Sequence, residues 1–248
     1  MRKRIIAGNW KMNTTVSEAV ELAEAVKAQY DNFDVDVVLC APYTNLYAVH
    51  QVIQDAPIGL GAQDLYWEDS GAYTGQVSAG MLTSVGCNYV IIGHSEPRQY
   101  FGETDETVNK KVKKALASNL LPIVCVGELL EEREANQTEA VVETQVKGAL
   151  DGLTKEEAAK LVIAYEPVWA IGTGKVATPE QAQDVHKFIR DLLAKLYDQE
   201  LADGIRIQYG GSMKPANAAE LLAQPDIDGG LIGGAALKAD SFLGIVNA

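Results

Sequence analysis

Cysteine is scarce in this sequence, with three residues among 248. Cys40, Cys87 and Cys125 are odd in number and widely spaced, which excludes a small protein stabilised by disulfides. Cys40 and Cys125 lie in or at the end of apolar runs, where buried and reduced thiols are typical. Free thiols persist in a reducing compartment, so we expect a cytoplasmic protein.

Positive charge and long apolar runs are scarce as well. The chain has 21 lysines and arginines against 34 acidic residues, a formal net charge of −13. Such a surface disfavours nucleic acid and anionic membranes as partners, although a local basic site is compatible with it. No apolar run reaches the roughly 18 residues of a membrane span, and the apolar stretch after Met1–Arg4 is too short for a signal peptide.

The rest of the composition is that of a globular protein. Hydrophobic residues make up 47% of the chain and charged residues 22%, which excludes intrinsic disorder. No Gly/Ser/Pro-rich linker and no change of composition divides the chain. We therefore expect a single domain over residues 1–248.

Short runs rich in β-branched residues recur along the chain and predict eight strands. The middle runs lack polar/apolar alternation, which is typical of parallel strands that are covered on both faces. The runs are Arg4–Gly8, Val35–Cys40, Ile58–Ala62, Tyr89–Gly93, Leu121–Val126, Leu161–Tyr165, Ile205–Tyr209 and Ile227–Ile232.

Amphipathic stretches between these runs predict helices. Three of them begin with a helix-capping signal at Thr15, Thr154 or Thr178, each followed by Glu or Gln three residues later. Alternating strands and helices indicate an α/β protein with a parallel sheet. Pattern alone allows an open sheet, but the undivided chain favours a closed, single-domain (β/α)8 barrel, the TIM-barrel fold. The first helix is expected to bury Val16, Val20, Ala23 and Val26.

Several known signatures are incomplete here. Gly172–Lys175 resembles the end of a P-loop, but Val176 replaces the required Ser or Thr and Trp169 replaces the first glycine. Gly93–Pro97 misses the nucleophile elbow because Pro97 takes the place of its last glycine. The three histidines are not spaced as metal ligands. We expect neither a metal site nor a nucleotide cofactor.

Polar or glycine-rich segments follow five of the predicted strands. They are Asn9–Lys11, His94–Glu96, Glu166–Pro167, Gly210–Ser212 and Gly233–Gly234. Taken singly, each has an ordinary structural explanation, such as a solvated charge, a loop histidine or a tight turn. In a barrel, however, the carboxyl ends of all strands meet at one face, where active sites form.

The residue types at that face indicate a reaction class. Glu166 is a candidate general base, and His94 is a candidate acid or hydrogen-bond donor. Lys11 provides a local cation in an acidic protein, and the two glycine-rich turns offer backbone N–H groups to a phosphate. Proton transfer beside the carbonyl of a small phosphorylated compound fits these groups.

Four segments together resemble the triosephosphate isomerase family. They are Asn9–Asn13, Ile92–Glu96, Ala164–Lys175 and Tyr209–Ser212. The resemblance extends from the first strand to the last glycine turn and so covers essentially the whole chain.

The resemblance implies interconversion of dihydroxyacetone phosphate and glyceraldehyde 3-phosphate without a cofactor. It implies that Glu166 is the base and that His94 polarises the carbonyl as a neutral imidazole. It also implies that Lys11 and Asn9 contact the substrate and stabilise an enediolate, and that Glu96 supports Lys11. The backbone amides that it assigns to the phosphate are those of Gly172, Ser212, Gly233 and Gly234.

The resemblance further implies a mobile lid and a homodimer. The lid would have hinges at Pro167–Trp169 and Lys175–Ala177 and a tip at Ala170–Gly174. The loop Gly71–Gln76 would insert, with Thr74, into the partner subunit.

This sequence departs from the family at that interface. Gln76 stands where a glutamate is usual, and Pro97 where the first of two arginines is usual. The resemblance implies that this glutamate and this arginine form an ion pair across the subunit interface. Because both are missing here, the implied homodimer has to depend on other contacts.

Two other functions occur on the same type of fold. A phosphosugar lyase or synthase would need a metal or a Schiff-base lysine inside the barrel, and no predicted strand contains a lysine. A catalytically silent phosphate-binding barrel would be expected to lack Lys11, His94 or Glu166, and all three are present.

Overall fold

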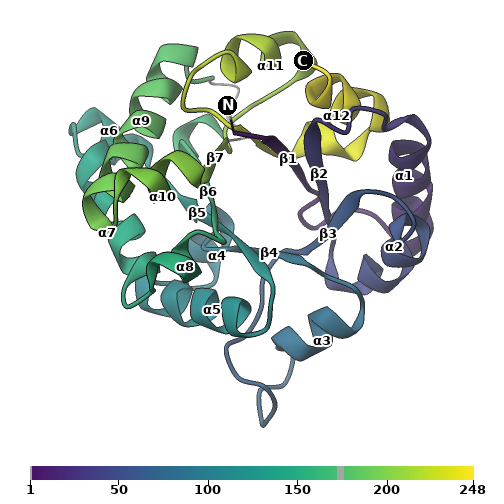
Figure 1. Ribbon diagram of the computed structural model, residues 1–248. Helices are drawn as coiled ribbons and strands as arrows, with labels where there is room; N and C mark the ends of the chain where they lie inside the picture. Colours follow the sequence, from purple (N-terminus) through teal and green to yellow (C-terminus); the bar gives the residue numbers. More distant parts are fainter. Residues whose placement is uncertain (1, 172–175) are drawn as a thin grey trace.

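The computed structural model describes residues 2–171 and 176–248 and contains a closed barrel of eight parallel strands (Figure 1). Each strand pairs with the next along the chain, and the last pairs with the first. The predicted (β/α)8 fold is confirmed. The strands are β1 (Arg4–Asn9), β2 (Val35–Cys40), β3 (Ile58–Ala62), β4 (Tyr89–Ile92), β5 (Leu121–Val126), β6 (Val162–Tyr165), β7 (Arg206–Tyr209) and β8 (Gly229–Ile232).

Closure of the barrel depends on a close backbone approach between β8 and β1. Ile5 is paired with Gly229, whose φ of +151° is uncommon for residues with a side chain. A Cβ atom at Gly229 would lie 1.8 Å from the carbonyl oxygen of Ile5. A glycine is therefore required where the first and last strands join.

Helices surround the barrel, as Figure 1 shows. Full capping boxes form at Thr154 and Thr178. In each, the threonine N–H donates to the side chain of the residue three positions later, Glu157 or Gln181, and the threonine hydroxyl accepts the backbone N–H of that same residue. At Thr15 only half of the box forms, with Glu18 accepting from the Thr15 N–H at 2.7 Å. The α-helices are α1 (Val16–Gln29), α2 (Leu46–Ile53), α3 (Ala79–Ser84), α4 (Ser95–Tyr100), α5 (Asp105–Ala117), α6 (Leu130–Glu134), α7 (Thr138–Leu150), α8 (Lys155–Ala158), α9 (Pro179–Leu196), α10 (Gln199–Gly204), α11 (Pro215–Leu222) and α12 (Ala239–Val246), and the 3-10 turns are η1 (Tyr43–Asn45), η2 (Val168–Ala170) and η3 (Gly234–Leu237).

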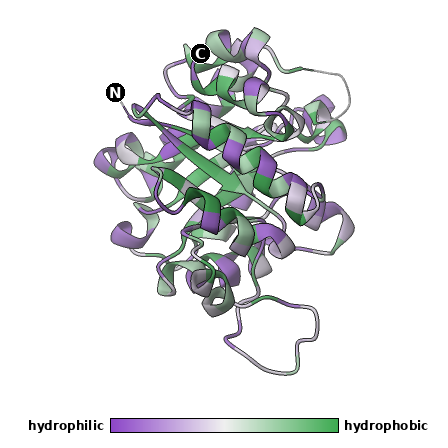
Figure 2. Cartoon of the chain, turned by 90° about the vertical axis from the view of Figure 1, so that its right-hand side faces the viewer, coloured by the Kyte–Doolittle hydropathy of each residue, from purple (hydrophilic) through white to green (hydrophobic). Residues whose placement is uncertain are grey.

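The core has two layers. One fills the barrel interior and includes Ile5, Ile91 and Val162, and the larger one lies between the strands and the helices. Figure 2 shows the apolar strands at the centre and polar residues over the outer helices. All three cysteines are buried and free.

The buried face of α1 differs from the prediction. Val16 is 48% exposed, and Ala19 and Leu22 are buried together with Ala23 and Val26. Val16 is the first residue of the helix, next to the turn after β1, so it lies beyond the part of α1 that packs on the barrel. In the described residues, no helix has the length and apolar character needed to cross a membrane.

Candidate active site

A cavity of about 550 Å³ opens at the carboxyl end of the strands. Residues that follow β1, β4, β6, β7 and β8 line this main cavity, so the fold gathers segments that lie far apart in the sequence. Glu96 lies beside the lining, and Gly172 lies outside the described residues. The predicted site residues in the lining are Asn9, Lys11, His94, Glu166, Ser212, Gly233 and Gly234.

Glu166 follows β6 directly and is 2% exposed. One carboxylate oxygen, Oε1, lies 2.8 Å from Nε2 of His94, and Oε2 accepts from the backbone N–H of Ser95 at 2.9 Å. Burial raises the pKa of Glu166, but these two contacts outweigh it and hold the pKa below the usual value for a glutamate. The carboxylate is therefore ionised near neutral pH.

Two glycines make room for Glu166. A Cβ atom at Gly210, just after β7, would lie 2.8 Å from Cγ of Glu166. A Cβ atom at Gly127, after β5, would lie 1.7 Å from the carbonyl oxygen of Glu166. The strands on both sides of β6 thus end in residues without side chains, which lets a buried carboxylate occupy the space between them.

His94 is the N-cap residue of α4, and its ring takes part in the cap. Its Nδ1 accepts the backbone N–H of Glu96 at 3.1 Å. A neutral imidazole has one acceptor and one donor nitrogen, so this bond assigns the proton to Nε2, which faces Glu166. The ring is oriented to donate a hydrogen bond into the main cavity.

The charge of His94 depends on Glu166. Burial lowers the pKa of His94, but the adjacent Glu166 carboxylate, with a smaller contribution from Glu96, more than offsets burial and leaves the pKa raised. The pKa of His94 is therefore raised only while its ring is in contact with the Glu166 carboxylate.

Lys11 and Asn9 form the third part of the site. Nζ of Lys11 lies 2.8 Å from Oε1 of Glu96, and Oδ1 of Asn9 accepts the backbone N–H of Lys11 at 3.0 Å. Lys11 has a φ of +51°, which is uncommon for a residue with a side chain. Such a conformation typically costs about 1–3 kcal/mol and recurs at functional sites. Gln63 donates to the Lys11 carbonyl at 3.0 Å and helps to hold it.

The turn after β8 approaches this cation, and the turn after β7 lines the same cavity. A Cβ atom at Gly233 would lie 4.0 Å from Nζ of Lys11, so the ammonium group approaches the backbone of that turn. Gly233 is the N-cap of η3, which begins at Gly234, and Ser212 lines the same cavity. The arrangement combines backbone N–H groups with a nearby positive charge, as phosphate sites do.

The predicted first hinge of the lid is anchored on Glu128. This glutamate follows β5 and is fully buried, and its Oε1 accepts from Nε1 of Trp169 at 2.8 Å and from the hydroxyl of Tyr165 at 3.1 Å. Arg133 donates to the same oxygen at 3.0 Å and lies over the Trp169 ring, 4.8 Å from its centroid. Residues 172–175 of the predicted tip and second hinge lie outside the described residues.

Gln63, Ser95 and Glu128 were not assigned a role from the sequence. Gln63 directly follows β3, and Glu128 is the second residue after β5. Both are polar residues just past the end of a strand, the same sequence feature that identified Lys11 and Glu166. Ser95 contributes a backbone N–H, which no residue type reveals. In residues 2–171 and 176–248, no group of three His, Cys, Asp or Glu residues is placed to hold a metal ion.

Comparison with known proteins places this site in a family. The model of the triosephosphate isomerase family matches residues 4–248. The triosephosphate isomerase of Alkaliphilus oremlandii (strain OhILAs) is 55% identical over 247 residues, covering 100% of both chains. That of Rhodopirellula baltica is 57% identical over 248 residues, covering 100% of this chain and 98% of the relative. That of Chlorobium phaeovibrioides is 58% identical over 250 residues, covering 100% of this chain and 99% of the relative. The chain therefore belongs to the triosephosphate isomerase family and has its aldose–ketose isomerase activity.

Proposed function

We propose that Glu166, His94, Lys11 and Asn9 carry out the isomerisation, in the cavity that they line together. The observation that supports this assignment is the contact between a buried, ionised Glu166 and the donor nitrogen of His94, 2.8 Å apart, in a cavity that also holds Lys11. In these roles the chain interconverts dihydroxyacetone phosphate and glyceraldehyde 3-phosphate.

Glu166 acts as the base. Its carboxylate takes a proton from the substrate carbon beside the carbonyl, which leaves an enediolate, and the resulting carboxylic acid returns the proton to the former carbonyl carbon. The hydroxyl proton of the first carbon moves to the oxygen of the second, beside Nε2 of His94, so that the old carbonyl becomes a hydroxyl and the first carbon becomes the new carbonyl. The lowered pKa keeps the group ionised before the reaction. No electrons are gained or lost in the cycle, so it requires no redox cofactor, and the proposal includes none.

His94 donates a hydrogen bond to the substrate oxygens through Nε2. A substrate lying between His94 and Glu166 breaks the contact that raises the pKa of His94, and burial then favours the neutral ring. The bond from the Glu96 N–H to Nδ1 persists and keeps the proton on Nε2. A neutral donor fixed in this way strengthens its bond as charge develops on the enediolate oxygen.

Lys11 supplies the positive charge that stabilises the enediolate and attracts the anionic substrate. Asn9 holds the backbone of Lys11 in place and also contacts the substrate. Glu96 positions the Lys11 ammonium group through their 2.8 Å contact. Because the ammonium group and the N–H groups are placed before the substrate arrives, little free energy is lost to reorganisation during the reaction.

The phosphate binds to the backbone N–H groups of Ser212, Gly233 and Gly234. Their turns meet at the end of the main cavity beside Lys11, which supports this assignment. Gly172 is proposed as a fourth donor, on the lid. The lid closes over the substrate from the hinge held by Glu128, and closure excludes water from the enediolate.

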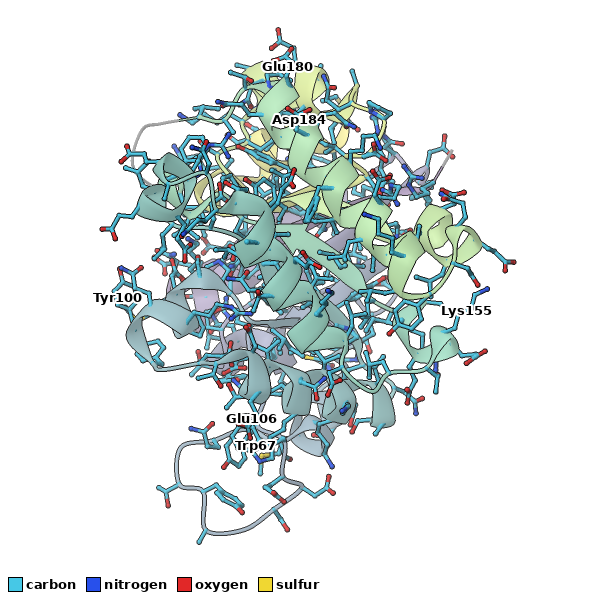
Figure 3. The ribbon with its side chains drawn as sticks, turned by 90° about the vertical axis from the view of Figure 1, so that its left-hand side faces the viewer. Trp67, Tyr100, Glu106, Lys155, Glu180 and Asp184 are labelled. Carbon is cyan, nitrogen blue, oxygen red and sulfur yellow. The ribbon has the colours of Figure 1, made fainter. Side chains whose placement is uncertain are left out.

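A homodimer is proposed, formed through the loop Gly71–Gln76. This loop projects from the barrel between β3 and α3 (Figures 1 and 2). Its base is braced by an aromatic cluster, in which the Tyr66 ring lies 4.8 Å from that of Tyr73 and 4.1 Å from that of Trp67. Figure 3 shows Trp67 at this base, next to the projecting loop. A loop that is already ordered loses little entropy on docking.

Exposed apolar side chains at two other turns are proposed to take part in the same interface. Phe101 is 82% exposed, Met12 97% and Tyr100 65%. The Tyr100 and Phe101 rings lie 6.4 Å apart, and contiguous exposed apolar residues typically mark interaction sites. We propose that they and Thr74 replace the ion pair that Gln76 and Pro97 cannot form.

The chain is proposed to act in the cytoplasm, as one domain over residues 1–248. Its three free and buried thiols are compatible with a reducing compartment.

Substitution of the base tests the catalytic assignment. We expect Glu166→Gln to lower kcat by about 10²–10⁴-fold, because the amide preserves the shape but cannot accept the proton. KM should change far less. A coupled assay of isomerisation measures both constants, with Glu21→Gln, at an exposed position of α1, as the control. A loss smaller than about tenfold would refute the role of Glu166 as base.

A stable analogue tests the phosphate assignment. A small phosphorylated carboxylate that resembles the enediolate should bind competitively, since such mimics gain from contacts that strengthen along the reaction. Its phosphate should lie at the backbone amides of Ser212 and Gly233 in a crystal of the complex. A phosphate bound elsewhere, with those amides free, would contradict the assignment.

A further inference from the structure

The main cavity continues beyond the proposed phosphate site. Past Ser212 its lining includes Lys214 and Pro215, and past Gly234 it includes Lys238 and Ser241. These residues belong to the starts of α11 and α12, which lie next to each other in Figure 1. The volume of about 550 Å³ falls in the range that holds drug-sized ligands, about 300–1,000 Å³. A three-carbon phosphate leaves much of it unfilled.

The charge of this outer part is positive and unpaired. Among the described residues, three lysines and one acidic residue, Glu166, line the main cavity. Lys11 pairs with Glu96, but in the described part of the chain neither Lys214 nor Lys238 has a carboxylate within ion-pair distance. On a chain with a net charge of −13, two unpaired lysines at the mouth of a cavity concentrate anions there.

The outer part also has unused hydrogen-bonding capacity. The Ser241 hydroxyl is half-buried and makes no hydrogen bond to another described residue. Lys214 is two residues from Ser212, so their Cα atoms lie within about 7 Å of each other. A second anionic group bonded directly to the bound phosphate would therefore lie in the part of the main cavity that Lys214 and Lys238 line.

We propose that Lys214, Lys238 and Ser241 form an outer anion subsite that binds the second phosphate of a linear condensed phosphate such as pyrophosphate. The inner phosphate occupies the amides of Ser212 and Gly233, so this inference rests on the proposed phosphate site. Condensed phosphates then compete with the triose phosphate. The main cavity has no aromatic residue in its described lining, so a nucleoside attached to the diphosphate finds no stacking partner there.

Inhibition constants for three probes test the subsite in the wild-type enzyme. Orthophosphate, pyrophosphate and adenosine diphosphate are compared as competitors of the triose phosphate at one fixed ionic strength. We expect pyrophosphate to bind about tenfold more tightly than orthophosphate, because one added charge-assisted hydrogen bond typically increases affinity by about that factor. Adenosine diphosphate should bind no more tightly than pyrophosphate.

A matched pair of double variants separates a local site from overall charge. Lys214→Gln with Lys238→Gln should remove most of the advantage of pyrophosphate and leave the orthophosphate constant nearly unchanged. Lys113→Gln with Lys160→Gln changes the net charge equally at two lysines that lie outside the main cavity and have no ion pair within the described residues. This control should keep the full advantage. A crystal with pyrophosphate should place the outer phosphate beside Nζ of Lys238.

The outcomes distinguish the two proposals. If orthophosphate competes but pyrophosphate is no better, or if both double variants weaken pyrophosphate equally, the outer subsite is refuted and the phosphate site stands. If orthophosphate does not compete, the phosphate site fails and the outer subsite fails with it. Tighter binding of adenosine diphosphate than of pyrophosphate would overturn the condensed-phosphate assignment in favour of a nucleotide.

Discussion

Glu166 depends on its immediate neighbours for both its position and its charge. His94 and the Ser95 N–H stabilise the carboxylate against the cost of burial, and Gly210 leaves the space that its side chain fills. If Glu166 is the base, as proposed, catalysis should be sensitive to a single methyl group placed next to its carboxylate, because close-packed interiors accommodate little added volume.

We expect Gly210→Ala to lower kcat by at least about tenfold, since a displacement of 1 Å at a reacting group can cost about 10²-fold. The added Cβ would lie 2.8 Å from Cγ of Glu166 and 3.2 Å from the carbonyl oxygen of Tyr165. The free energy of unfolding should fall by about 1–3 kcal/mol as well. Steady-state kinetics and urea unfolding measure the two effects.

Gly204→Ala is the matched control, because a Cβ at Gly204 meets nothing within 4 Å. It should leave kcat unchanged. Wild-type kcat in Gly210→Ala would mean that the position of Glu166 tolerates displacement, and the argument from close packing would then be wrong.

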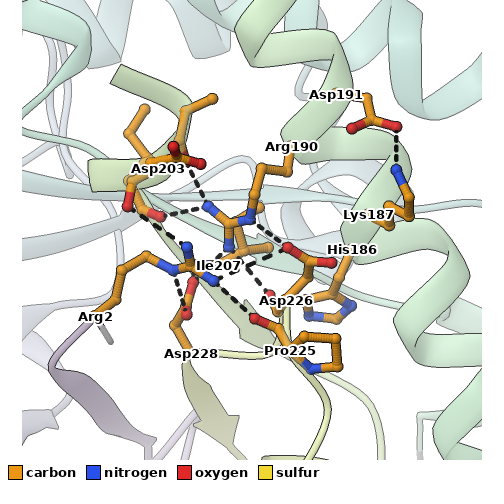
Figure 4. A network of polar contacts seen from close by, with 12 residues as sticks. Arg2, His186, Lys187, Arg190, Asp191, Asp203, Ile207, Pro225, Asp226 and Asp228 are labelled. Atoms are coloured by element: carbon orange, nitrogen blue, oxygen red, sulfur yellow. Dashed lines mark hydrogen bonds and ion pairs between the residues drawn. The ribbon is translucent and has the colours of Figure 1, made fainter. Parts of the chain in front are cut away.

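At the scale of elements, α9 is fixed to the amino-terminal end of β8 by a buried ion-pair cluster (Figure 4). Arg190 on α9 donates to Asp226 at 2.6 Å and to Asp228 at 2.7 Å, and also to the backbone carbonyl of Ile205 at 3.0 Å. Arg2 joins the cluster through Asp228 at 2.6 Å. This end of the barrel is opposite the catalytic face, so the cluster serves stability.

Arg190→Met should lower the free energy of unfolding by about 3–5 kcal/mol, because it removes the buried cation that Asp226 and Asp228 share and leaves them only the partly exposed Arg2. Lys187→Met is the control. Lys187 pairs with Asp191 on the exposed side of the same helix (Figure 4), where such a pair contributes about 0.5 kcal/mol or less. Urea unfolding measures both, and equal losses would show that burial of the cluster is not what matters. The folded fraction of Arg190→Met should retain wild-type kcat.

His186 on α9 makes stability depend on pH. It is fully buried, its Nδ1 lies 2.7 Å from the Ala182 carbonyl, and burial lowers its pKa to about 4. The unfolded chain protonates at about pH 6.5. The stability that the neutral ring contributes is therefore complete above about pH 6.5 and is lost as the pH falls toward 4, by about 3 kcal/mol in all.

Urea unfolding at pH 7.5 and 4.5 and at one protein concentration tests this dependence. His186→Gln should lose less stability between the two pH values than the wild type, because the amide does not titrate. His50→Gln, at a partly exposed histidine, should behave like the wild type. Identical pH dependence of all three proteins would rule out His186 as the source.

At the scale of the whole molecule, the proposed subunit interface lacks the ion pair that the family resemblance implies. Removing one member of a buried pair typically costs about 3–5 kcal/mol, whereas replacing both can be nearly neutral. Gln76 and Pro97 replace both members. Pro97 lies in the first turn of α4, where the missing N–H breaks no helix hydrogen bond.

We therefore expect a dimer whose association depends weakly on salt, since apolar contacts are not screened. Sedimentation at micromolar concentration, in low and in high salt, should find dimers in both. A monomer would contradict the dimer, and a dimer that dissociates steeply with salt would show that other ion pairs hold it. Phe101→Ser, which removes an exposed apolar side chain, should weaken association more than Phe33→Ser, at a 61% exposed position next to β2.

The sequence by itself determined the class of fold and the chemistry of the site. Apolar runs alternate with amphipathic stretches because parallel strands are covered on both faces, and this regularity predicted eight parallel strands. The undivided chain then favoured a closed barrel over an open sheet. Glu166, His94 and Lys11 could be selected because barrel sites form just past the strands. Residue type was sufficient to propose a base, a donor and a cation.

The tertiary structure alone decided which atoms meet. The contact of Glu166 with the Ser95 N–H joins groups 71 residues apart, and its cause lies in glycines whose missing side chains leave room. Val16, predicted to be buried, is exposed because α1 packs on the barrel only beyond its first residue. Lys214 and Lys238 belong to separate helices and share a cavity only when β7 and β8 lie side by side. The local sequence pattern indicates the chemical type of each side chain. The distances between these side chains, and therefore their electrostatic interactions, depend on closure of the barrel.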